Sequence, residues 1–183
     1  MELTSIFDSA RRFVEKAGYG SEIAVVRDRY FDAQTAESFR DQYVYVVLNT
    51  GMKNQVAERI FQRFIKSGRD SSTIHHQGKQ RAIRRAEEDY TGWFTALKFS
   101  EDPLGYLETL PWIGPITKFH LARNLGLDYA KPDRHLQRLA DTLGFPDAQS
   151  LCKKVAVLTG ERVGVVDVIL WRACNLGWSP TRS

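Results

Sequence analysis

Hydrophobic residues recur at helical spacing along most of the chain. Apolar stripes with three- and four-residue spacing run through residues 4–17, 36–48, 53–66 and 79–98, the last of which is also rich in charge. Shorter stripes follow at 104–110, 116–125, 133–143, 146–158 and 163–176. Only residues 23–26, Ile-Ala-Val-Val, fit a strand as well as a helix. The pattern predicts an all-α protein.

Turn-forming residues divide these stripes. Glycines at positions 18, 51, 68, 126 and 144 follow helical stretches and suit the left-handed conformation that ends a helix. Asp102-Pro103 indicates a helix start, because Asp caps amides well and Pro fits the first helical position. Residues 68–78 are polar and are expected to form a loop.

The stretch from Leu110 to Lys118 predicts a tight hairpin between two helices. Pro111 and Gly114 mark the turn, and Pro115 suits the first position of the second helix. The first amides of that helix have no internal partner and lie at the positive end of the helix dipole. The hairpin is therefore a candidate phosphate-binding site.

Composition indicates a globular protein, with 43% hydrophobic and 26% charged residues. No apolar run is long enough to span a membrane and no secretory signal is recognised, so a cytoplasmic location without membrane association is expected. Cys152 and Cys174 lie far apart in apolar, helix-like settings, which favours buried thiols over a disulfide framework or a cysteine-ligated metal. We expect no cofactor.

Positive charge gathers in two places, although the net charge is only +4. One cluster comprises Lys79, Arg81, Arg84 and Arg85 and is equally well explained as a solvated helix face. The other surrounds the hairpin and comprises Lys118, Arg123, Lys131, Arg134 and Arg138. This distribution favours an acidic partner.

The order of these parts resembles the helix-hairpin-helix (HhH-GPD) DNA glycosylases, the superfamily that includes endonuclease III. The matching parts, which span residues 36–175, are a helix and loop (39–54), a basic helix (79–98), the hairpin (110–114) and the Pro132-Asp133-Arg134-His135 segment. The resemblance implies a monomer of two helical lobes with the active-site cleft between them. One lobe, 36–130, contains the hairpin, and the other combines 1–35 with 131–183. Double-stranded DNA is the implied partner.

By this resemblance, Asp133 falls on the family's catalytic aspartate. Cleavage of an N-glycosidic bond develops positive charge on the sugar, and a fixed carboxylate stabilises that charge and orients or deprotonates the attacking water. Alternatively, Asp133 simply caps the helix that follows it. The two roles are compatible.

The resemblance also implies a set of contacts to the DNA backbone. They involve hairpin amides around Trp112, Gly114, Ile116 and Thr117, and the side chains of Lys118, Arg134 and His135. The carbonyls of Leu110 and Ile113 are implied as ligands of a monovalent cation, and no other metal site is expected. Adjacent His75 and His76 lie in a polar loop without cysteine partners, which argues against a metal site there.

Two hairpin positions depart from the family pattern. Ile116 occupies the position where bifunctional members carry the lysine that forms a Schiff base with the sugar, and Lys118 lies about 200° around the helix. A monofunctional enzyme, without lyase activity, is therefore implied. Trp112 replaces the first hairpin glycine, and because Trp does not easily take a positive φ, the resemblance does not fix the hairpin geometry there. The iron–sulfur cysteines are absent.

The loop 49–54 lies where the family inserts a side chain into the gap left by the extruded nucleotide. Met52 or Asn54 would fill that gap, unless the loop is an ordinary interhelical turn. Asp167, inside the apolar run 165–171, is either tied to the core or part of a pocket.

The leading functional hypothesis is a monofunctional DNA glycosylase that excises a damaged or modified base. The sequence around Gly114–Gly126 and Lys131–Leu136 resembles a bacterial and phage-associated branch, which implies a bulky modified pyrimidine of phage DNA as target and phage defence as role. One alternative is a transferase that attaches an amino acid to an activated thymine derivative. Another is a noncatalytic DNA-binding module in which Asp133 is only a cap.

Overall fold

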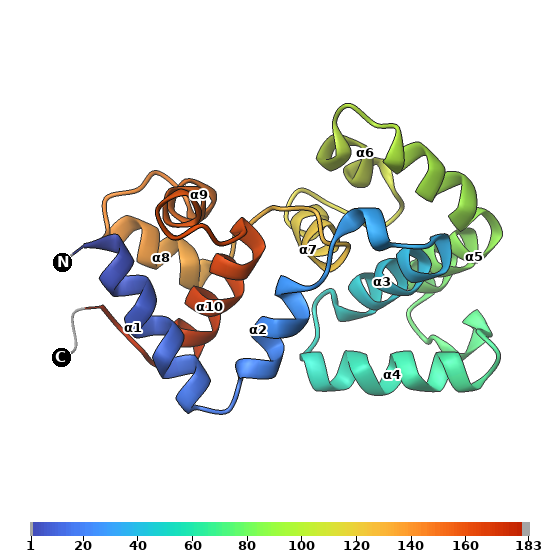
Figure 1. Cartoon of the computed structure of the whole chain (residues 1–183). Helices are drawn as coiled ribbons and strands as arrows, with labels where there is room; N and C mark the ends of the chain where they lie inside the picture. Colours follow the sequence, from blue (N-terminus) through green and yellow to red (C-terminus); the bar gives the residue numbers. More distant parts are fainter. Residues whose placement is uncertain (1, 181–183) are drawn as a thin grey trace. The chain divides into compact units, whose positions relative to one another are not determined.

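The computed structural model describes residues 2–180, and all regular structure in this range is helical (Figure 1). The α-helices are α1 (Leu3–Lys16), α2 (Gly20–Arg27), α3 (Ala36–Asn49), α4 (Asn54–Lys66), α5 (Gln77–Lys98), α6 (Pro103–Thr109), α7 (Thr117–Asn124), α8 (Arg134–Thr142), α9 (Ala148–Thr159) and α10 (Val163–Asn175). Short 3₁₀ helices lie at Phe31–Ala33 and Ser71–Thr73. The all-α prediction is confirmed, and the ambiguous run 23–26 is part of α2.

The chain forms two compact units. The terminal unit contains residues 2–31 and 126–180, and the central unit contains residues 32–125. The lobe boundaries expected from the sequence, after residues 35 and 130, lie a few residues later than the observed boundaries, after residues 31 and 125. The hairpin belongs to the central unit and Asp133 to the terminal unit.

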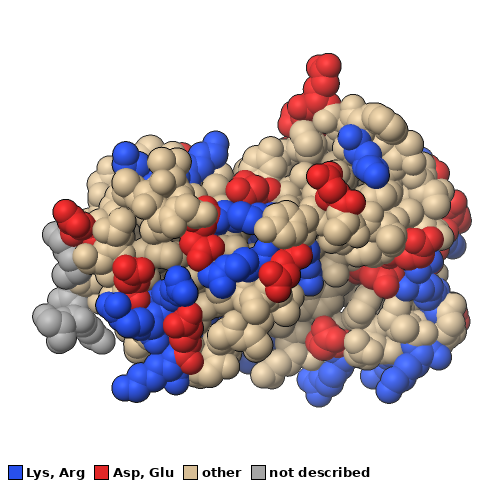
Figure 2. Space-filling view, viewed as in Figure 1, with Lys and Arg blue, Asp and Glu red and all other residues tan. Residues whose placement is uncertain are grey.

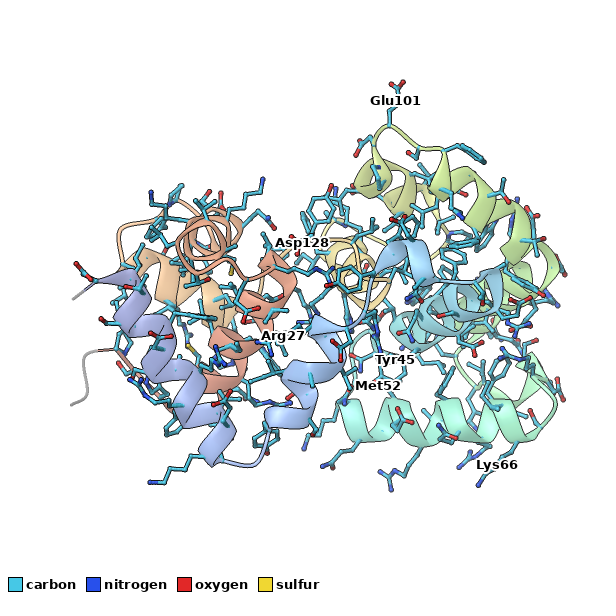
Figure 3. All side chains as sticks on the ribbon, in the orientation of Figure 1. Arg27, Tyr45, Met52, Lys66, Glu101 and Asp128 are labelled. Carbon is cyan, nitrogen blue, oxygen red and sulfur yellow. The ribbon has the colours of Figure 1, made fainter. Side chains whose placement is uncertain are left out.

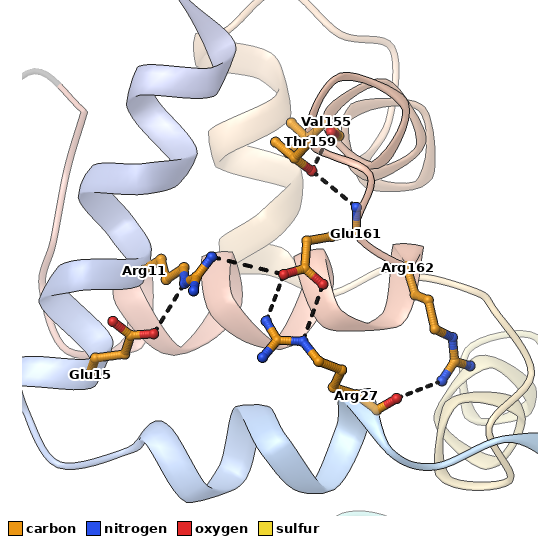
Figure 4. A network of polar contacts seen from close by, with 7 residues as sticks. All are labelled: Arg11, Glu15, Arg27, Val155, Thr159, Glu161 and Arg162. Carbon is orange, nitrogen blue, oxygen red and sulfur yellow. Dashed lines mark hydrogen bonds and ion pairs between the residues drawn. The ribbon is translucent and has the colours of Figure 1, made fainter.

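The terminal unit is built around α10, which is buried over most of its length and contacts α1, α2, α8 and α9. A helix that is apolar on all sides is stable only when other helices cover it. Polar contacts hold its beginning in place. Glu161 accepts a 2.6 Å hydrogen bond from Arg27, and Arg162 donates to the Arg27 carbonyl at 3.4 Å (Figure 4). Arg162 also donates to the carbonyls of Arg29 and Gly126 at 2.6 and 2.7 Å. These contacts connect the start of α10 to residues that come just before and just after the central unit in the sequence.

The central unit packs α3 against α5, with α4 and α7 on other sides of α3. Phe39, Tyr43 and Leu48 line the buried side of α3, and the Tyr43 ring meets Trp93 edge-on at 5.4 Å. Helix α5 is kinked at Asp89, whose φ of −142° and ψ of 25° are not helical. In this packing, Tyr43 of α3 makes a hydrogen bond to the hairpin between α6 and α7.

Most helix ends follow the local sequence signals. Asp102 caps α6 by accepting a 3.0 Å hydrogen bond from the Gly105 amide, and Gly126 and Gly144 adopt φ of +84° and +77° beyond α7 and α8. Pro115 is an exception, because it lies in the turn and α7 begins at Thr117. The Lys118 amide nevertheless donates to the Gly114 carbonyl at 3.0 Å, so this turn already has a helical hydrogen bond.

No helix within residues 2–180 is both long enough and apolar enough to cross a bilayer.

Candidate functional site

The hairpin between α6 and α7 is anchored by buried residues on both sides of its turn. Leu110 and Ile113 are buried, and the Ile113 amide donates to the Leu110 carbonyl at 3.1 Å. Tyr43 donates its hydroxyl to the Pro111 carbonyl at 2.5 Å. Burial raises the pKa of this hydroxyl, so it stays a donor at neutral pH. The turn is thus held by both packing and hydrogen bonds.

The amides of the hairpin turn and of the start of α7 divide into engaged and open groups. The Gly114 amide donates to the Thr117 hydroxyl at 2.7 Å, so it is occupied within the hairpin. By contrast, the amides of Trp112, Ile116 and Thr117 have no acceptor within residues 2–180. Open amides at the positive end of a helix dipole are the groups that bind phosphate. The implied clamp therefore has three available donors, and the Gly114 amide joins it only by releasing Thr117.

Trp112 adopts φ of +67°, a conformation that tryptophan does not easily take. Its ring meets His76 edge-on at a centroid distance of 5.0 Å and lies against Gly78. A Cβ at Gly78 would come within 2.3 Å of the indole, so only glycine admits the ring there. These contacts offset a backbone strain of order 1–3 kcal/mol. Trp112 remains 39% exposed.

Ile116 and Lys118, the two positions on which the expected absence of lyase activity rests, have different surroundings. Ile116 is 57% exposed. Lys118 forms an ion pair with Glu108 of α6, and its ammonium lies 5.6 Å from the centre of the Phe119 ring. The implied phosphate contact of Lys118 stays a prediction, and it would compete with Glu108 for the ammonium.

Asp133 caps α8 with one of its two carboxylate oxygens. Oδ1 accepts hydrogen bonds from the amides of His135 at 2.8 Å and Leu136 at 3.3 Å. Oδ2 has no hydrogen-bond partner in the described part of the chain. Arg134 is exposed and His135 is half-buried beside it. The geometry allows one oxygen to fix the carboxylate while the other interacts with a substrate.

The segment just before Asp133 is hydrogen-bonded to helices α9 and α10. The Lys131 amide donates to Asp167 of α10 at 2.8 Å, and the Ala130 amide donates to Gln149 of α9 at 2.8 Å. Asp167 is fully buried. Of the two readings of Asp167, the structure supports the one that ties it to the core, where it holds the backbone just before Asp133. In the sequence, the only sign of this role was that Asp167 is a single acidic residue inside an apolar run.

Cys174 of α10 is a neighbour of Asp133 that sequence reasoning missed. Burial, together with the negative charge of Asp133, raises the pKa of its thiol to about 11. The thiol is therefore neutral at physiological pH and adds no negative charge next to Asp133. Cys152 is buried as predicted.

The loop from Asn49 to Asn54 is held by side-chain and backbone hydrogen bonds. Asn54 accepts from the Asn49 side chain at 2.8 Å and from the Tyr45 hydroxyl. Met52, in the same loop between α3 and α4, is half-buried (Figure 3). Asn54 thus has its carbonyl oxygen engaged in the loop. Insertion of Met52 or Asn54 into DNA stays a prediction.

The sequence grouped Lys79 with a basic cluster, but the structure buries this residue, and only 4% of it is exposed. Its ammonium donates to the carbonyls of Leu48 at 2.8 Å and Thr50 at 2.6 Å. These carbonyls end α3 and lack helical partners, which is why a lysine is stable there. Burial lowers the pKa of this ammonium. The clustered Arg81, Arg84 and Arg85 are exposed.

The histidines preceding α5 have a structural role. His76 caps the helix, with Nδ1 accepting from the Lys79 amide at 3.4 Å, and its ring packs on Trp112. Within residues 2–180, no group of His, Cys, Asp and Glu side chains is arranged to hold a metal ion.

The structure therefore assembles two groups of functional candidates. The central unit brings together the hairpin, Trp112, His76, Lys79 and the Met52 loop. The terminal unit brings together Asp133, Arg134, His135, Asp167 and Cys174.

Comparison with known proteins identifies the fold. No protein-family model and no curated protein sequence matches the chain. Among solved structures, it matches the crystal structure of the 8-oxoguanine DNA glycosylase of Thermotoga maritima with a TM-score of 0.67. The match covers 93% of this chain and 96% of that chain at 19% sequence identity. The protein thus has the fold of a helix-hairpin-helix DNA glycosylase, as its sequence pattern indicated.

Proposed function

We propose that the protein is a monofunctional DNA glycosylase that hydrolyses the N-glycosidic bond of a damaged or modified base and leaves an abasic site. The observation that carries this proposal is the state of Asp133 on a glycosylase fold. One oxygen is fixed by the first amides of α8, and the other has no hydrogen-bond partner in residues 2–180. Such a preorganised carboxylate is suited to stabilising a developing sugar cation.

The proposed reaction begins with DNA bound through its backbone. The open amides of Trp112, Ile116 and Thr117 bind phosphate, and the target nucleotide leaves the base stack to expose its glycosidic bond. The bond from C1′ to the base nitrogen breaks, and its electron pair leaves with the base. A water molecule then bonds to C1′, losing one proton, while the departing base gains one. Asp133 stabilises the positive sugar and accepts the water's proton.

Hydrolysis without strand cleavage is proposed because the hairpin offers no amine at the required position. Ile116 has no nucleophile, and the Lys118 ammonium is paired with Glu108. Bifunctional enzymes form an imine with the sugar before they cleave the strand. This hairpin position has no amine from which such an imine could form.

The substrate that we propose is a bulky modified pyrimidine of phage DNA, such as a glycosylated hydroxymethylcytosine, with phage defence as the biological role. Support comes from the sequence around Gly114–Gly126 and Lys131–Leu136, which resembles a bacterial and phage-associated branch of the family.

The test is incubation of the full chain with duplexes that carry candidate bases, followed by alkali treatment and mass spectrometry. Release of a free base and alkali-labile DNA support the proposal. A mass gain on the DNA would instead identify an amino-acid transferase. Binding without any chemical change across the panel would identify a noncatalytic DNA-binding module.

A further inference from the structure

Trp112 of the hairpin is strained and exposed at the same time. Its φ of +67° is a strained conformation for tryptophan, whereas glycine adopts it freely. The ring packs against Gly78, yet 39% of Trp112 stays exposed. Ile116, which follows the same turn, is 57% exposed. Strained residues concentrate at ligand clamps, so the indole is a candidate contact for a ligand.

Open hydrogen-bond donors lie next to this ring. The amides of Trp112, Ile116 and Thr117 have no acceptor within residues 2–180. Because one of these amides and the indole belong to the same residue, a phosphate bound at the amide brings its nucleotide within reach of the ring. In a duplex, neighbouring base pairs cover both faces of each base. An indole beside a bound phosphate can therefore stack only on a base of an unpaired strand.

Exposed arginines continue from the ring along α5. Gly78, which contacts the indole, is followed on the same helical face by Arg81 and Arg85, at spacings of three and four residues. Both arginines are exposed, and neither has an ion-pair partner in the part of the chain that the structure describes. With a rise of about 1.5 Å per residue, they lie roughly 4.5 and 10.5 Å along the helix axis from Gly78. Guanidinium groups placed in this way suit the phosphates of a strand that extends from the indole.

A second row of basic residues, on α4, lacks this setting. Arg59, Arg63 and Lys66 are exposed, and Lys and Arg side chains gather along this helix in Figure 2. None of the exposed residues of α4 is aromatic. A row of charge without other features is usually a solvated helix face. The row on α5 differs because it begins beside an exposed aromatic ring and open amides, and the row on α4 serves as its control.

We propose that the hairpin and the first turns of α5 form a binding surface for single-stranded DNA. A base stacks on Trp112, its phosphate is held by the Trp112 amide, and further phosphates contact Arg81 and Arg85. His76, which is exposed and meets the indole edge-on, supports the ring from the start of α5. The proposal rests on the phosphate contacts proposed for the hairpin, but it uses no residue of the terminal unit. It adds an unpaired strand to the duplex that is expected as a partner.

The first experiment measures binding of dye-labelled single strands to the full chain by fluorescence anisotropy. One ligand is an oligothymidylate, and the other has the same number of sugars and phosphates but an abasic-site analogue in place of every base. Both carry the same charge, so only contacts to the bases separate them. We expect the oligothymidylate to bind about tenfold more tightly, which is the effect of one stacked base.

Variants of Trp112 test whether the ring makes this contact. Trp112→Ala should bind the oligothymidylate about tenfold more weakly and bind the base-free strand as the wild type does, whereas Trp112→Phe should keep most of the preference. If Trp112→Ala does not fold, as judged by circular dichroism, Trp112→Gly gives the same comparison without the strained φ. Equal weakening of both strands, or a wild type that does not distinguish them, would overturn the proposal.

Salt dependence tests the arginines. Each phosphate contact on a single strand contributes about 0.7 to the slope of log affinity against log salt concentration. Arg81→Gln and Arg85→Gln should each reduce the slope by about this amount. Arg59→Gln removes the same exposed charge from α4 and should leave the slope unchanged. Equal changes in all three variants would indicate attraction to net charge alone, and the proposed surface would be wrong.

Asp133→Asn separates this surface from the proposed hydrolysis. Asp133 belongs to the terminal unit, so this variant should bind both strands as the wild type does. A preference for oligothymidylate without base release from any duplex would support this surface and refute the proposed function. Base release without that preference would refute this surface alone.

Discussion

Replacing Gly78 with alanine should destabilise the protein, although glycine-to-alanine changes in helices usually stabilise. Gly78 lies in the first turn of α5, where alanine would normally gain about 0.5–1 kcal/mol. Here, however, the new Cβ would lie 2.3 and 2.8 Å from two atoms of the Trp112 ring. The rigid indole is held against His76 and has to move as a whole. Overpacking of this kind costs about 1–3 kcal/mol, so the sign of the effect reverses.

Gly20 provides the matched control. It lies in the first turn of α2, and a Cβ there would meet no heavy atom within 4 Å. Urea unfolding of both variants should show a lower midpoint for Gly78→Ala and an unchanged or higher midpoint for Gly20→Ala, with similar slopes.

A double-mutant cycle with Trp112→Gly tests the cause. Without the indole, Gly78→Ala should become neutral or stabilising, which would give a coupling energy of about 2 kcal/mol. If Gly78→Ala raises the midpoint as much as Gly20→Ala, or if the cycle shows no coupling, the packing of Trp112 described above is wrong.

Further predictions concern the proposed chemistry and its support. Asp133→Asn should abolish base release without lowering stability, because asparagine caps helices as well as aspartate; Asp147→Asn, at the cap of α9, should keep full activity in the same assay. Asp167→Leu should lower kcat and leave DNA affinity intact, and an unchanged kcat would show that Asp133 is positioned without it. Ile116→Lys should allow borohydride to trap a covalent enzyme–DNA adduct, and the wild-type chain serves as the negative control. Lys79→Met should lower the free energy of unfolding by about 1–3 kcal/mol, unlike Arg81→Met, because the Leu48 and Thr50 carbonyls would lose their donor.

The features that were predictable from the sequence depend on neighbouring residues. The Asp102 cap and the left-handed Gly126 follow from the backbone preferences of those residues and the helices beside them. The capping role of Asp133 was predictable from its position before α8, whereas its catalytic role is implied by the resemblance and stays a prediction. The fold followed because hydrophobic spacing and the hairpin signal agree over most of the chain.

The features that were not predictable depend on partners far away in the sequence. Lys79 resembles its exposed basic neighbours until α3 places two unpaired carbonyls beside it. Trp112 tolerates a positive φ because Gly78 leaves room for its ring, and neither residue reveals the other in the sequence. The structural role of Asp167 depends on the packing that brings α10 next to the Lys131 amide.

The exposed indole of Trp112 gives the hairpin an intrinsic optical signal. Trp93 in the same unit is only 8% exposed, so water-soluble quenchers reach Trp112 far more readily. A duplex that covers the hairpin would shield this fluorophore and alter its emission without any attached dye. Trp112→Phe would remove the contribution of Trp112 to the emission and retain an aromatic ring, so the difference between the two proteins reports on the hairpin. Trp112 thus offers a label-free way to test whether DNA reaches the hairpin.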